Sequence, residues 1–175
     1  VPYVMDATKD DAFTVRWGEA TSTDDAEGEV VATSDVRPDA AAIAGVLDRF
    51  LGEIEHVPPK FSAIKVDGER AYDLARSGEE VELDSRRIEI LDLTLVDLPS
   101  REEARFRVTS GKGAYMRSLA RDLALALGTV GHIRDLRRLR VGPFAAERAI
   151  SMDSLADPMH NPASLEHLSP VETAL

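Results

Sequence analysis

The chain has 175 residues, of which 43% are hydrophobic and 30% charged, with a formal net charge of −11. This composition is typical of one globular domain and excludes a chain that is disordered throughout. Cysteine is absent, which excludes disulfides and thiolate metal sites, and the four histidines show no spacing typical of metal ligands. No apolar run approaches the roughly 20 residues of a membrane span, so we expect a cytoplasmic protein without membrane contact.

Hydrophobic periodicity predicts strands and helices in a mixed order. Alternation with period two predicts strands over residues 12–17, 29–34, 86–98 and 104–110, and helical spacing predicts helices over residues 38–50 and 71–76. Hairpin-like connections and few helices favour an α+β fold with a mixed, largely antiparallel sheet flanked by helices. We assign residues 1–150 to this domain and residues 151–175 to a peripheral C-terminal extension.

Charge is distributed unevenly along the chain. Residues 105–148 hold ten basic and three acidic side chains, a net charge of +7, which leaves −18 on the remainder. This split is typical of a protein with one anion-binding face and a solvated acidic surface. Arginines scattered over an ordinary surface give the same count, so both interpretations stay open on charge alone.

The stretch GKGAYMRSLARDLALALG, residues 111–128, joins a two-glycine turn to a predicted helix. Its apolar residues recur at helical spacing from Met116 to Leu127, and Gly128 ends the pattern. Arg117 then lies at the margin of the buried face near the helix N-terminus, where the helix dipole favours anions. It therefore needs a carboxylate or phosphate partner, and a plain salt bridge to a neighbouring element is the alternative.

Two charged clusters allow more than one interpretation. Asp24, Asp25 and Glu27 have the composition of a magnesium site, but acids in a Gly-bounded turn are more often a solvated hairpin, which we favour. The run RDLRRLR, residues 134–140, suits either phosphates in a cleft or a surface lattice of ion pairs.

Four motifs occur in the order GEATSTDDAEG, VPPKFSAIKVDGERAYDLARSG, GKGAYMRSLARDLALALG and LRRLRVGPF. Together they resemble the bacterial tRNA pseudouridine-55 synthases of the TruB type, over essentially the whole chain. The resemblance implies a pseudouridine synthase-type fold and an isomerase, monomeric when complete, that converts one uridine in the T loop of tRNA without metal or cofactor. It also implies that the target base is flipped out, attacked by an aspartate and rejoined through carbon 5.

The resemblance implies roles for individual residues. Tyr115 matches the tyrosine that packs on the uracil and is the candidate base for the carbon-5 proton. Arg117 matches the arginine paired with the catalytic aspartate, and Leu136 matches an apolar wall of the uracil pocket. Lys112 lies in the same motif and is expected to orient the turn or to contact an RNA phosphate.

The resemblance also implies an RNA-binding segment. Residues 57–78 resemble the family's loop that closes over the RNA stem-loop. Within this segment Lys65 and Arg70 are the candidate phosphate contacts, so the T stem-loop of tRNA is the expected partner.

Two departures from the family pattern stand beside these matches. The family's nucleophilic aspartate lies in a GTLDP-like motif, which this sequence lacks, and its base-stacking tyrosine corresponds to Asp11 here. A carboxylate cannot stack on uracil and would repel nearby phosphates.

Because the chain opens at VPYVMDATK without an initiating Met, we expect it to begin within a strand, with the sheet incomplete at the N-terminus and no activity alone. A non-catalytic tRNA-binding or RNA-folding module is the alternative.

Overall fold

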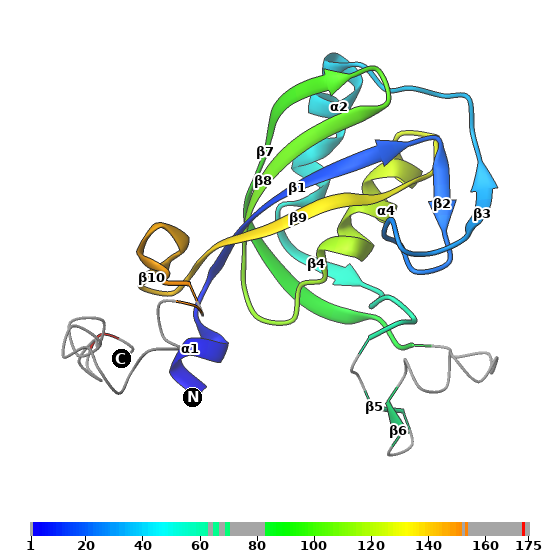
Figure 1. Cartoon of the computed structure of the whole chain (residues 1–175). Coiled ribbons are helices and arrows are strands. Elements are labelled where there is room, and N and C mark those ends of the chain that lie inside the picture. Colours follow the sequence, from blue (N-terminus) through cyan, green and yellow to red (C-terminus); the bar gives the residue numbers. More distant parts are fainter. Residues whose placement is uncertain are drawn as a thin grey trace.

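A six-stranded sheet in the order β10-β9-β1-β8-β7-β4 organises the molecule, and each neighbouring pair in it is antiparallel (Figure 1). The computed structural model describes residues 2–62, 65–66, 69–70, 83–151, 153 and 173. The strands of this sheet are β1 (Lys9–Trp17), β4 (Gly52–His56), β7 (Arg86–Ser100), β8 (Glu103–Ser110), β9 (Gly131–Val141) and β10 (Phe144–Ala145). Two separate hairpins pair β2 (Glu19–Thr21) with β3 (Val30–Thr33) and β5 (Lys65–Val66) with β6 (Glu69–Arg70).

Two of the described helices lie against one face of the sheet. The α-helices are α1 (Pro2–Asp6), α2 (Ala40–Leu47) and α4 (Met116–Ala126), and the 3₁₀ turns are η1 (Asp48–Phe50) and η2 (Ala146–Arg148). Figure 1 shows α2 and α4 side by side on the same face, where both contribute to one core. The helix α2 begins after Asp39 because its carboxylate accepts a hydrogen bond from the Ala42 amide at 2.8 Å.

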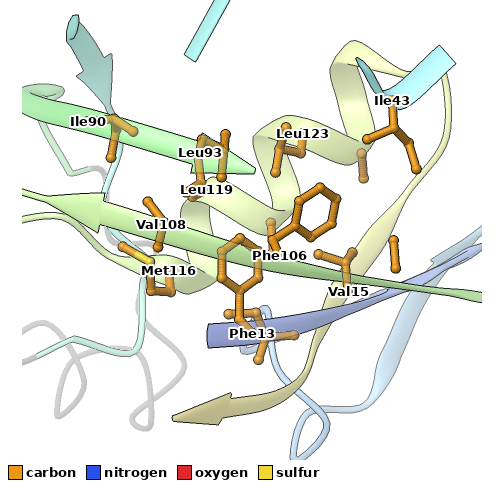
Figure 2. Close-up of a cluster of buried hydrophobic side chains, with 14 of the residues drawn as sticks. Phe13, Val15, Ile43, Ile90, Leu93, Phe106, Val108, Met116, Leu119 and Leu123 are labelled. Carbon is orange, nitrogen blue, oxygen red and sulfur yellow. The ribbon is translucent and has the colours of Figure 1, made fainter. Parts of the chain in front are cut away.

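The core forms where the alternating strands meet α4. Phe13 of β1 and Phe106 of β8 are paired across the sheet, and their ring centroids lie 5.3 Å apart in a stacked arrangement. Leu119 and Leu123 of α4 cover them, and all four side chains are buried (Figure 2). Apolar side chains thus fill one face of the sheet, and the intervening residues of β1 and β8 face the other way.

The predicted α+β class and largely antiparallel sheet are confirmed. Parallel pairing within the described part of the chain is limited to one isolated bridge, between Asp25 and Ile133. The expectation that the chain begins within a strand is wrong, because residues 2–6 form the helix α1. The predicted helix over residues 71–76 lies outside the described residues, and the domain boundary near residue 150 stays a prediction.

The arginine-rich run of residues 134–140 lies in a strand. It forms most of β9, which pairs with β1 along its whole length. Consecutive side chains therefore point to opposite faces of the sheet. Within the described residues, no helix is long and apolar enough to cross a membrane.

Candidate functional site

The N-terminus of α4 presents Tyr115 and Arg117, which are two positions apart in sequence, on the same turn. Gly113 makes this possible, because its φ of 86° lies in the left-handed region that favours glycine. Tyr115 is the N-cap residue, with extended backbone angles, and its side chain does not cap the helix. The turn thus delivers both predicted residues to the first turn of one helix.

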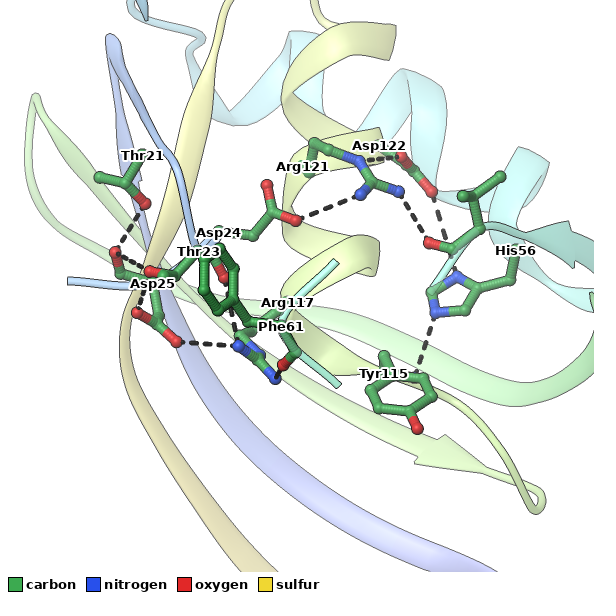
Figure 3. Close-up of polar contacts among 11 residues, drawn as sticks. Thr21, Thr23, Asp24, Asp25, His56, Phe61, Tyr115, Arg117, Arg121 and Asp122 are labelled. Atoms are coloured by element: carbon green, nitrogen blue, oxygen red, sulfur yellow. Dashed lines mark hydrogen bonds and ion pairs between the residues drawn. The ribbon is translucent and has the colours of Figure 1, made fainter. Parts of the chain in front are cut away.

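Arg117 finds a carboxylate partner within the chain. Its Nη1 donates to Asp25 Oδ2 at 3.2 Å and to the Thr23 carbonyl at 3.2 Å, and its Nη2 donates to the Phe61 carbonyl at 2.8 Å (Figure 3). Both members of the ion pair are about three-quarters buried. The predicted need for an anion is therefore met by the β2–β3 turn, and a backbone carbonyl from the segment after β4 adds a third contact.

Arg121, one helical turn further on, makes a parallel set of contacts. It donates from Nη1 to Asp24 Oδ2 at 3.2 Å, from Nε to Asp122 Oδ1 at 3.0 Å, and from Nη2 to the Val57 carbonyl at 3.0 Å. Burial raises the pKa of Asp24, and the positive charges of Arg121 and Arg117 oppose that rise. The two arginines of α4 together hold the β2–β3 turn and the start of the 57–78 segment (Figure 3).

The acidic turn is a hairpin held by arginines. Asp24 and Asp25 each direct a carboxylate oxygen to a different arginine of α4. Thr23 closes the turn by donating from Oγ1 to Asp25 Oδ1 at 2.5 Å. Among the described residues, no group of three or more His, Cys, Asp or Glu side chains is placed to hold a metal ion. These contacts support a hairpin over the magnesium site, but the expectation of a solvated turn is wrong, because the Asp24 and Asp25 side chains are only 17% and 25% exposed.

His56 is a site residue that the motifs did not reveal. It ends β4 and is buried, and its Nε2 accepts a hydrogen bond from the Tyr115 amide at 3.1 Å. The two rings are stacked with centroids 6.4 Å apart (Figure 3). Burial lowers the pKa of His56, with Arg121 acting in the same direction and Asp122 opposing. A lone histidine before a Val-Pro-Pro sequence carries no signal that distinguishes it from a core residue.

Asp11 is only 1% exposed and belongs to an ion pair. Its Oδ1 accepts from Arg138 Nε at 2.5 Å, while its Oδ2 is buried without a hydrogen-bond partner among the described residues. Leu136 is 50% exposed and pairs with Phe13, two positions along β9 from Arg138. Asp11, Leu136 and Arg138 therefore lie on the same face of two adjacent strands, and Asp11 is not a free carboxylate.

The remaining candidates lie apart from this group. Lys112 Nζ forms an exposed ion pair with Asp6 Oδ1 at 2.7 Å, which ties the glycine turn to α1. Lys65 and Arg70 pair across the β5–β6 hairpin, and their side chains lie outside the described residues. In the described part of the chain, no hydrogen bond or ion pair joins Tyr115 or Arg117 directly to Asp11.

Most of the basic block of residues 105–148 is neutralised locally. Seven of its ten basic side chains form ion pairs with carboxylates: Arg105, Lys112, Arg117, Arg121, Arg134, Arg138 and Arg140. Arg134 pairs with Glu103, and Arg140 pairs with Asp10 at 2.6 Å. Within the described residues the run 134–140 is thus largely a lattice of ion pairs between strands.

Family models cover the whole chain. The model of the TruB family pseudouridylate synthase N-terminal domain matches residues 1–116, and that of the tRNA pseudouridylate synthase B C-terminal domain matches residues 117–175. The chain belongs to the TruB family. Its match to tRNA pseudouridine synthase B of Rhodospirillum rubrum is 60% identical over 175 residues, covering 100% of this chain and 57% of that protein. The match to the protein of the same name from Caulobacter vibrioides is 51% identical and covers 100% and 56%.

This TruB family chain therefore spans a little over half the length of the curated relatives it matches. Solved structures share its fold. A chain of a Cbf5-Nop10-Gar1 complex superimposes with a TM-score of 0.70 at 23% identity, covering 99% of this chain and 44% of that chain. A chain of an H/ACA ribonucleoprotein bound to a substrate RNA containing 2'-deoxyuridine gives a TM-score of 0.61 at 20% identity, covering 99% and 40%. The predicted pseudouridine synthase-type fold is thereby confirmed.

Proposed function

We propose that the protein containing this chain is a tRNA pseudouridine synthase that isomerises uridine 55 of the T loop. Family membership supports the reaction class, and the names of relatives at 51–60% identity support tRNA as the substrate. The observation that carries the proposal is the pair Tyr115 and Arg117 on the first turn of α4, with Arg117 held from three directions.

The reaction breaks the bond between uracil N1 and the ribose and forms a bond between carbon 5 and the same ribose carbon. Carbon 5 loses a proton and N1 gains one, so the reaction consumes no oxidant or reductant. Tyr115 packs on the flipped base and accepts the carbon-5 proton. Its backbone is fixed by the helix that follows and by His56, which keeps the ring in place while the base turns.

Arg117 orients the attacking carboxylate. Asp25 and two backbone carbonyls occupy its Nη1 and Nη2, while its Nε makes no hydrogen bond to the described residues. A guanidinium fixed in this way can offer its Nε–H to a second carboxylate. We propose that this second carboxylate is the aspartate of the family's GTLDP-like motif, which attacks the nucleotide. Asp25 instead holds Arg117 in place.

The RNA partner is the T stem-loop. Leu136 forms an apolar wall for the flipped uracil, and Arg138 neutralises Asp11 at the position where the family carries a stacking tyrosine. Lys65 and Arg70 of the β5–β6 hairpin, together with Lys112, contact phosphates. The protein acts as a cytoplasmic monomer.

The test uses an unmodified T stem-loop RNA and an assay for pseudouridine. We compare this chain alone, the chain completed to family length (below, the family-length protein), and the Rhodospirillum rubrum relative. The family-length protein should convert uridine 55 and no other uridine, and the chain alone should not. No conversion by the family-length protein, with the relative active, would refute the proposal. Conversion by the chain alone would show that the nucleophile lies within it.

The same samples address the RNA-binding alternative. Binding of the T stem-loop RNA by the chain alone, measured at two salt concentrations, should weaken steeply with salt if phosphates are contacted. Salt-sensitive binding by the chain, together with no conversion by the family-length protein, would assign the protein to a non-catalytic RNA-binding module.

A further inference from the structure

His56 is a buried titratable side chain to which the reaction itself assigns no step. It lies at the end of β4, opposite the exposed Arg86 of β7, and only 1% of its surface is exposed. Buried polar groups in proteins are almost always hydrogen-bonded, so the partners of its two ring nitrogens define what the side chain does.

One nitrogen has a specific partner. The Tyr115 amide donates to His56 Nε2 at 3.1 Å, which requires this nitrogen to carry no proton. The neutral ring therefore carries its proton on Nδ1. The ring plane of His56 also lies within 15° of that of Tyr115, at a centroid distance of 6.4 Å. A single side chain thus contacts both the backbone and the ring of Tyr115.

The other nitrogen faces a charged pair on α4. Nδ1 lies 4.0 Å from Asp122 Oδ2 and has no hydrogen-bond partner among the described residues. Arg121 in turn bonds Asp122 and the Val57 carbonyl, directly after His56. The charged groups that face the ring are therefore Asp122, which favours protonation, and Arg121, which opposes it.

We propose that neutral His56 is the positioning residue for Tyr115, and that protonation of its ring releases the Tyr115 amide and moves the tyrosine out of its reactive position. The role of Tyr115 in chemistry rests on the proposed function, whereas the bond between His56 and Tyr115 does not. Protonation places an N–H on Nε2, where it would meet the amide N–H of Tyr115. Two donors repel each other, so the contact is lost.

Burial lowers the pKa of His56 below the ordinary histidine value of 6.5. The bond is therefore intact at neutral pH and is lost as the pH falls through the lowered pKa of His56. The lowered pKa of His56 therefore predicts that turnover falls at acidic pH when His56 becomes protonated, although His56 is not one of the reacting groups.

The first test is independent of activity and uses this chain labelled with ¹⁵N. The Nδ1-protonated neutral tautomer should be visible from the ring nitrogen shifts of His56 at pH 7. The Tyr115 amide should exchange with solvent about tenfold faster in His56→Leu, since one hydrogen bond is lost, and should stay protected in His56→Gln. Glutamine carries its side-chain oxygen near the place of Nε2 and does not titrate.

A proton on Nε2 at pH 7, or an unchanged Tyr115 amide in His56→Leu, would overturn the proposal. The matched control is His132→Gln, because His132 is also buried and its Nδ1 contacts the Glu19 carbonyl at 2.8 Å, with no hydrogen bond to Tyr115 among the described residues. It should leave the Tyr115 amide unchanged. If His56→Leu fails to fold, the tautomer and the pH titration of the Tyr115 amide in the unsubstituted chain still decide.

The second test measures turnover of the family-length protein. His56→Leu should lower the maximal rate by roughly 10- to 100-fold with little change in RNA affinity, because a displaced catalytic group affects the rate more than binding. His56→Gln should recover most of the rate and remove the acid limit. An identical acid limit in His56→Gln would refute the pH-dependent part, whereas absent turnover in the unsubstituted protein would refute only the proposed function.

Discussion

Arg117 on the first turn of α4 and Asp25 in the β2–β3 turn form an ion pair of 3.2 Å, although 92 residues separate them in sequence. Two backbone carbonyls complete the contacts of the same guanidinium. Three acceptors in different directions need a planar group with several fixed donors, and lysine lacks that geometry.

Arg117→Lys should therefore lower turnover of the family-length protein by about 100-fold or more while the fold is kept. Single-turnover conversion of the T stem-loop RNA and circular dichroism measure the two effects. Arg105→Lys is the matched control, because Arg105 forms an exposed pair with Asp97 on a sheet strand. Equal turnover in both variants would show that Arg117 forms only a structural salt bridge and has no role in the reaction.

Asp24 combines a buried carboxylate with a left-handed backbone, at φ 61°. Its raised pKa means that its contribution to stability is complete below the unfolded value of 3.8 and is lost as pH rises through the folded value. At pH 7, Asp24→Asn should thus change the unfolding free energy little, since asparagine tolerates this backbone and is uncharged. Asp24→Ala should lower the unfolding free energy by about 1 kcal/mol more than Asp24→Asn does, because alanine disfavours this left-handed backbone. Urea unfolding of both variants at pH 7 measures this, and equal stabilities would contradict it.

Asp10 behaves in the opposite way. The hydrogen bond from Arg140 is the largest of the effects that hold the pKa of Asp10 below 3.8. Its contribution to stability is therefore present above pH 3.8 and is lost as pH falls through the lower folded value. In Asp10→Asn, the midpoint temperature of unfolding should therefore fall less between pH 5 and pH 2 than it does in the unsubstituted chain. The exposed Asp84→Asn is the control, and an equal effect there would reject the assignment.

Arg138 is the described cation that pairs with the buried Asp11 carboxylate. Arg138→Ala leaves that charge buried and unpaired, so it should cost about 3–5 kcal/mol of unfolding free energy. Arg137→Ala, next to it on β9 and without an ion pair among the described residues, should cost less than about 0.5 kcal/mol.

The double variant Asp11→Ala/Arg138→Ala should recover part of that loss, because no charge is then left uncompensated. Denaturant unfolding of the unsubstituted chain, Asp11→Ala, Arg138→Ala and the double variant forms a complete mutant cycle. Additive costs of the two single substitutions would show that the pair is not coupled.

The strands with clean alternation were predictable from sequence, and β9 was not. In β8, Phe106 and Val108 alternate with Arg105 and Arg107, so one face is apolar and the period is visible. In β9 the buried residues come first, and charged residues then occupy both faces. Its strand character comes from pairing with β1, a long-range contact that local periodicity does not report.

The candidate site was predictable in part for a similar reason. The helix pattern placed Arg117 at a buried margin and required an anion, but which carboxylate meets it depends on how the β2–β3 turn folds back onto α4. His56 gave no pattern at all, because its role arises from one backbone amide that β4 and α4 bring together.

The carbonyl of Phe61 is bonded to Arg117, and the chain that leaves Phe61 continues to the β5–β6 hairpin with Lys65 and Arg70. Under the proposed function the hairpin contacts RNA and Arg117 orients the attacking carboxylate, and only four positions of sequence separate Lys65 from the carbonyl that Arg117 bonds. On that proposal, capture of the substrate and alignment of the attacking group would share one short connection in the chain.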